Sequence, residues 1–216
     1  MRLLIIFFCL LLGNSINAQS NEKTPIETLK EGVLAVRLPS NNKKILAIEK
    51  MLENTKSEKE IKRLQKLRQE TIDERDRTRK YMMQYFNTDY SFSQVVFFYD
   101  TAITKLAQGH PNDIFLNENG NIDKNISVTN KQILILNYGA NTDPSTSSGV
   151  SGASITDSKL KLVPAPFPNF VSITGIRLGW YKLNRSTATE ALIARRLAKK
   201  INQKFKDFYN DKHQKL

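Results

Sequence analysis

Two runs of apolar, branched and aromatic residues enclose a long segment with helical periodicity, and this arrangement most restricts the fold. The first run is Val33–Leu38, which ends at Pro39, and the second is Phe92–Tyr99. Short runs of this composition are typical of strands. Two strands joined by a helical connection within one domain usually form a right-handed parallel pair. We therefore expect a single α/β domain in which residues 41–87 cross from one strand to its parallel neighbour.

The crossing segment is predicted to be a helical hairpin. Ile45, Ile48 and Leu52 recur at helical spacing in its first half. Residues 57–60 read SEKE, a capping box in which Ser57 and Glu60 satisfy each other's free backbone amides and begin a second helix. Two helices joined by so short a turn must run antiparallel.

The remaining segments predict a mixed sheet. Strand-like patterns occupy residues 113–116, 131–136, 160–163 and 170–183. Between them, residues 139–158 contain 12 Ser, Thr or Gly residues, from which we expect a flexible loop.

The C-terminal segment predicts an amphipathic helix that begins at a capping box, Thr187–Glu190. Its apolar stripe, which we expect to pack on the sheet, consists of Ile193, Leu197, Ile201, Phe205 and Phe208. The opposite face carries Arg195, Arg196, Lys199 and Lys200. Residues 182–216 hold ten Lys or Arg and three Asp or Glu. A basic amphipathic helix is also a candidate for binding a membrane surface or an acidic partner.

The N-terminus has the layout of a secretory signal peptide. Arg2 precedes the apolar run Leu3–Leu12, and Ala18 offers a small residue for cleavage before Gln19. The run is shorter than the roughly 20 residues of a membrane span, so no transmembrane span is expected in the mature chain. Cleavage would remove Cys9, the chain's one cysteine, and with it any disulfide or cysteine-ligated metal. We expect a periplasmic or secreted protein.

The chain of 216 residues carries a formal net charge of +12. For an exported protein, the available counter-charges are anionic lipid head groups, cell-wall polymers and acidic proteins, and we do not expect nucleic acid as the partner. The alternative is that the charge only keeps the protein soluble.

Three arginines of the second predicted helix, Arg68, Arg75 and Arg79, fall on one side of a helical wheel. Three guanidinium groups in a row could clamp a carboxylate, phosphate or sulfate. The alternative is that the charged stretch 73–80 projects past the body of the domain and is solvated. Such a hairpin can also serve as an arm that docks partner proteins.

Chemically reactive groups are few. Asp100 follows the strongest strand pattern, and His110 lies ten residues later, so the two are candidates for general acid–base catalysis. The alternative is that Asp100 caps a short helix and His110 begins a loop. The spacing of His and acidic residues predicts no metal site, and no cofactor-binding motif occurs.

The segments EGVLAVRL, SFSQVVFFYD, DIFLN and PFPNF, together with the export signal, resemble a group of small exported proteins of uncharacterised function from Bacteroidetes bacteria. The resemblance implies a periplasmic or secreted location and carries no catalytic residue or cofactor.

The sequence therefore favours a non-enzymatic exported protein that binds an anionic envelope component or an acidic protein through basic helical surfaces. Two alternatives stay open: an enzyme with a site near Asp100 and His110, and an envelope scaffold that docks partners through the hairpin.

Overall fold

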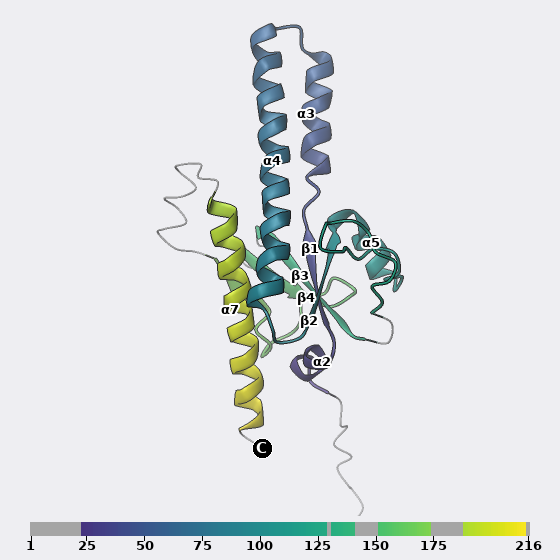
Figure 1. Cartoon of the computed structure of the whole chain (residues 1–216), viewed down its shortest axis with the longest axis vertical. Helices are drawn as coiled ribbons and strands as arrows, with labels where there is room; N and C mark the ends of the chain where they lie inside the picture. Colours follow the sequence, from purple (N-terminus) through teal and green to yellow (C-terminus); the bar gives the residue numbers. More distant parts are fainter. Residues whose placement is uncertain (1–22, 129–130, 141–150, 174–187, 215–216) are drawn as a thin grey trace, which may run out of the picture.

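The computed structural model describes residues 23–128, 131–140, 151–173 and 188–214 (Figure 1). These residues form one open, mixed sheet with helices, as expected for an α/β fold. Its strands are β1 (Val33–Leu38), β2 (Gln94–Tyr99), β3 (Ile133–Ala140), β4 (Ser151–Thr156) and β5 (Phe170–Ser172). The spatial order is β2-β1-β3-β4-β5. β1 runs parallel to β2 and β3, whereas β4 is antiparallel to β3 and to β5.

The predicted helical hairpin between β1 and β2 is confirmed, but its predicted capping box is wrong, since the Ser57 side chain makes no capping hydrogen bond and the Glu60 carboxylate pairs with Arg63. It consists of α3 (Asn42–Asn54) and α4 (Glu58–Asp89), and it leads into a parallel ladder that runs from Val33↔Gln94 to Leu38↔Tyr99. Ile48 of α3 and Leu64 of α4 are buried. The upper part of the hairpin extends past the sheet, while the last turns of α4 lie over it (Figure 1). We call α3 and the stretch of α4 that packs beside it the arm.

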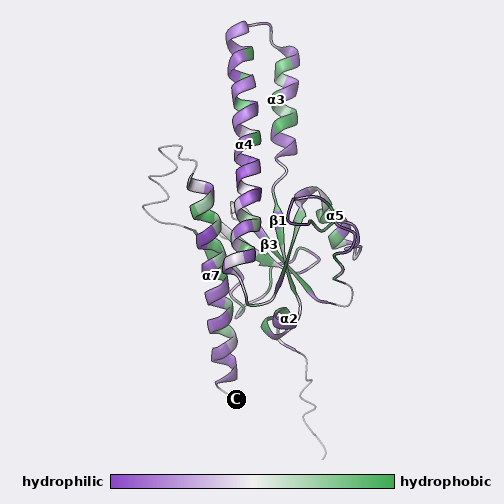
Figure 2. Cartoon of the chain, in the orientation of Figure 1, coloured by the Kyte–Doolittle hydropathy of each residue, from purple (hydrophilic) through white to green (hydrophobic). Residues whose placement is uncertain are grey.

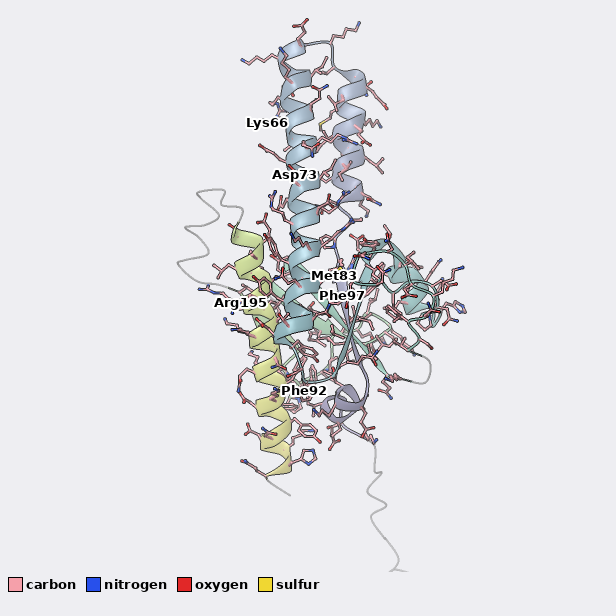
Figure 3. The ribbon with its side chains drawn as sticks, viewed as in Figure 1. Lys66, Asp73, Met83, Phe92, Phe97 and Arg195 are labelled. Carbon is pink, nitrogen blue, oxygen red and sulfur yellow. The ribbon has the colours of Figure 1, made fainter. Side chains whose placement is uncertain are left out.

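Both faces of the sheet are covered in the described part of the chain. Because successive side chains of a strand point to opposite faces, Leu34 and Val36 of β1 face one side while Val33 and Ala35 face the other. The first side packs against α2 (Pro25–Glu31), the last turns of α4, and α7 (Ala188–His213). Figure 3 shows Met83 of α4 over the sheet near Phe97 of β2, and both belong to this core.

The second side of the sheet packs against a shorter layer. This layer contains α5 (Ile103–Ala107), which buries Leu106, and the chain that follows it, which buries Phe115 and Val128. The fold therefore has three layers, with the larger apolar core beneath α4 and α7.

The apolar stripe of the C-terminal helix packs as expected. Ile193 is 8% exposed, and Leu197, Ile201 and Phe205 are fully buried. The ring of Phe205 lies 5.7 Å from that of Phe92 and 5.4 Å from that of Phe167, measured between ring centres. The basic residues consequently face outward. Thr187 of the predicted capping box lies outside the described residues.

The prediction of a flexible loop over residues 139–158 is wrong for its described ends. β3 continues to Ala140, and residues 151–156 form β4. β4 pairs along β3 from Ala140↔Ser151 to Ile135↔Thr156 and buries Ala153 and Ile155. Residues 151–156 therefore form a strand because they pair with β3, although their local composition is typical of a loop. Residues 141–150 lie outside the described part.

Of the other strand predictions, two are wrong and the longest, over residues 170–183, is confirmed only at its start. Residues 113–116 and 160–163 take part only in isolated bridges, such as Phe98↔Phe115 and Thr156↔Leu162. Of residues 170–183, the described part contains β5, which is three residues long.

One helix, α2, was not anticipated from the sequence. It begins after Thr24, whose backbone N–H donates to Oε2 of Glu27 over 2.7 Å, and Pro25 occupies its first turn. Thr24, Pro25 and Glu27 are a recognisable start signal. The predicted signal peptide, residues 1–18, and its cleavage site at Ala18–Gln19 lie outside the described residues. No helix within the described ranges combines the length and the hydropathy of a transmembrane segment.

Candidate functional site

Of the three arginines predicted to form an anion clamp, Arg75 and Arg79 approach the same carboxylate, that of Asp76, at 2.8 and 3.7 Å, and Arg68 is paired elsewhere. Arg68 bonds to Glu49 of α3, with its Nη2 2.7 Å from the carboxylate Oε1. Arg75 bonds to its neighbour Asp76, with Nε 2.8 Å from Oδ1. Arg68 thus links the two helices of the arm. Each of these two guanidinium groups already forms an ion pair with a carboxylate of the chain itself.

Arg79 has a different role from the one that its spacing predicts. Its Nε donates to the carbonyl of Pro39 over 2.7 Å, and its guanidinium carbon lies 4.4 Å from the centre of the Tyr99 ring. Only 20% of the side chain is exposed. Burial, followed by the charge of Arg75, lowers the pKa of Arg79, yet an arginine stays protonated at neutral pH. Arg79 therefore fastens α4 to the carboxyl ends of β1 and β2.

The predicted acid–base pair is not assembled. Asp100 begins the 3-10 helix η1 (Asp100–Ala102) directly after β2, at the carboxyl end of the parallel strands. His110 is exposed, and its neighbours Gly109 and Pro111 line a surface pocket with residues 131–134, at the amino end of β3. The two side chains thus lie toward opposite ends of the strands. One carboxylate oxygen of Asp100, Oδ1, is buried and has no hydrogen-bond partner among the described residues.

The basic residues of α7 gather on its outward half. We define the α7 basic face by six residues of α7: Arg195, Arg196, Lys199, Lys200, Lys204 and Lys206. The six residues lie within a stretch of twelve, residues 195–206, which spans about 17 Å of the helix axis at 1.5 Å per residue. α7 is the outermost helix on its side of the sheet (Figure 1).

Four members of the α7 basic face contact the body of the protein. Arg195, labelled in Figure 3, lies 3.4 Å from the carboxylate of Asp89. Lys206 donates to the hydroxyl of Ser91 over 3.1 Å. Two others donate to the backbone of β5: Lys200 to the carbonyl of Ser172 and Lys204 to that of Phe170, over 3.2 and 3.4 Å.

Arg196 and Lys199 differ from these four. Neither has an ion pair or hydrogen bond to another described residue. Lys199 is exposed and Arg196 is half-buried. Their positive charge is therefore not neutralised by a neighbouring carboxylate in the described part of the chain.

A small pocket of about 260 Å³ separates α4 from the first turns of α7. Glu74, Tyr138 and Glu190 line it, and Arg77 lies 3.1 Å from Oε1 of Glu190. Burial, with smaller contributions from the two carboxylates, raises the pKa of Tyr138. The sequence did not reveal this group, because its members lie on three elements far apart in the chain. Among the described residues, no three His, Cys, Asp or Glu are placed to hold a metal ion.

Comparison with known proteins gives no family for this fold: no family model, curated protein or solved structure matches the chain. The functional argument therefore depends on the geometry and charge described above.

Proposed function

We propose that this is an exported, non-enzymatic protein that binds an anionic envelope component or an acidic protein through the α7 basic face. The observation that carries the proposal is the outward array of six cations, of which only Arg195 has a carboxylate partner in the described part of the chain. Unneutralised charges on an accessible surface attract partners of opposite sign and accelerate their association.

The packing of α7 supports the proposal. Its apolar stripe packs in the core, where Leu197, Ile201 and Phe205 are fully buried. This leaves the helix rigidly held with its basic half toward solvent. A partner can thus meet a preformed set of charges, which lowers the entropic cost of binding.

The arm supports a second function, docking of a partner protein as an envelope scaffold. Leu46 and Met51 of α3 are 62% and 57% exposed, so the arm presents two large apolar side chains to solvent. Figure 2 shows hydrophobic residues along α3 beside a largely hydrophilic upper α4. The arm's charges, by contrast, are mixed in sign and include ion pairs such as Arg68–Glu49.

The test compares two double variants that remove the same charge from different surfaces. Arg196→Gln/Lys199→Gln alters the α7 basic face, and Lys43→Gln/Lys44→Gln alters exposed positions at the start of α3. The probe is fluorescent polyglutamate, and the measurement is its dissociation constant at about 20 and about 200 mM salt.

We expect the α7 variant to weaken polyglutamate binding about tenfold at low salt and the α3 variant to weaken it less than twofold. Binding of the unaltered chain should fade steeply at the higher salt concentration, because surface charges are screened there. Equal losses in the two variants, or an affinity that salt leaves unchanged, would refute the proposal.

A further inference from the structure

We propose that the anionic partner of the α7 basic face is a lipid membrane surface, to which the protein adsorbs through head-group phosphates without inserting. This inference depends on the proposed function and names the partner.

The arrangement of the cations on α7 fits a flat, diffuse array of negative charges. At 100° per residue, Arg195, Lys199 and Lys206 line one edge of the exposed half of the helix. Arg196, Lys200 and Lys204 line the other edge. Arg196 and Lys199, which have no ion pair or hydrogen bond among the described residues, lie at the inner positions of these two edges, so one plane can meet both charges at once.

The same face is poorly shaped for a compact anion. The pockets described above, beside α5 and between α4 and α7, are lined by none of the six cations. All six residues lie on the convex surface of a single helix. Four of them are lysines, whose ammonium groups act as point charges, whereas an arginine can donate two parallel hydrogen bonds to one anion. A bilayer surface needs no concave site, because its head groups are mobile and extend in two dimensions.

The distribution of apolar residues determines how the protein would sit on a bilayer. The large apolar side chains that are exposed in the described part of the chain are Leu46, Met51, Ile122, Leu160 and Leu162, and none belongs to α7. Insertion of α7 would require its stripe, which is buried in the core. The same lack of exposed aromatic or aliphatic anchors disfavours a tight protein–protein interface at this face. Adsorption is therefore electrostatic.

The test uses the chain from Gln19 onward, which retains every described residue, and measures sedimentation with phosphatidylcholine vesicles that contain or lack phosphatidylglycerol. We expect binding only to the vesicles with phosphatidylglycerol and loss of that binding at high salt. Arg196→Gln/Lys199→Gln should weaken binding about tenfold, and Lys43→Gln/Lys44→Gln less than twofold. Near-UV circular dichroism confirms that both variants fold.

Other results would overturn the inference in distinguishable ways. Binding to polyglutamate without binding to the anionic vesicles would remove the membrane as partner and leave the proposed function intact. Binding to neither probe would remove both. Equal binding to the two kinds of vesicle, or equal loss in the two variants, would show that the α7 basic face does not direct adsorption to anionic lipid.

Discussion

The guanidinium group of Arg79 lies over the ring of Tyr99, 4.4 Å from its centre, and joins the middle of α4 to the end of β2. The same group reaches the carbonyl of Pro39, which directly follows β1. One side chain thus connects the long connecting helix to both of the strands that it bridges.

Replacement of Arg79 should therefore destabilise the fold. The Arg79→Ala variant loses a charged hydrogen bond and a cation–π contact, which together contribute about 2 kcal/mol to the free energy of unfolding. Urea denaturation measures the change. Arg63→Ala is the control, because Arg63 has an exposed pair with Glu60 on the arm, and it should be indistinguishable from the unaltered chain. Equal stability of Arg79→Ala and the unaltered chain would show that the contact is not a structural link.

Gly152 provides a test of β4. A methyl group at this position would lie 2.6 Å from Cζ of Phe170 and equally close to the carbonyl oxygen of Val171. Because one of these atoms belongs to the backbone of β5, Gly152→Ala should lower the free energy of unfolding by about 2 kcal/mol. Ser154→Ala, two residues along the same strand, should change it by less than about 0.5 kcal/mol. An unaltered stability in Gly152→Ala would indicate that residues 151–156 do not pair as described.

The start of α2 predicts a dependence of stability on pH. The backbone N–H and the hydroxyl of Thr24 both donate to Glu27 and lower the pKa of its carboxyl below the ordinary value of 4.5, and the nearby His213 and Lys212 add to the effect. A carboxyl whose pKa is depressed by folding stabilises the protein above its unfolded pKa, and this stabilisation disappears as pH falls through the folded pKa. Glu27→Gln should therefore lower the melting temperature at neutral pH, with a difference that shrinks below pH 4.5.

The backbone bond is the larger of the two contributions from Thr24. Thr24→Val keeps this bond and removes only the hydroxyl, so it should retain most of the pH-dependent difference. A melting-temperature difference between Glu27→Gln and the unaltered chain that is constant from neutral pH to about pH 3 would contradict the assignment.

Sequence patterns predict those helices and strands for which the local pattern and the tertiary contacts favour the same secondary structure. The branched run Val33–Leu38 and the helical spacing of Ile45 and Ile48 are visible without a structure, and β1 and α3 form there. By contrast, β4 has the composition of a loop, and it is a strand because β3 offers a pairing edge. Composition alone cannot show such a partner.

The candidate site was less predictable than the fold. Arg79 shares a helical face with Arg75, but its partners Pro39 and Tyr99 lie 40 and 20 positions away, so its role depends on tertiary structure. Asp100 and His110 are close in sequence, yet α5 carries the chain toward the opposite ends of the strands. The outward direction of the cations on α7 was predictable, since it follows from the apolar stripe opposite them.

Amine footprinting tests the central claim, that anionic partners bind at α7, most directly. Lysines of the chain are acetylated with and without vesicles that contain phosphatidylglycerol, or with and without polyglutamate, and the modified positions are identified by mass spectrometry. The account predicts that Lys199 becomes protected while Lys43 and Lys44, which are also exposed in the free protein, keep their reactivity. Protection of Lys43 and Lys44 with full reactivity at Lys199 would place the contact on the arm and contradict the account.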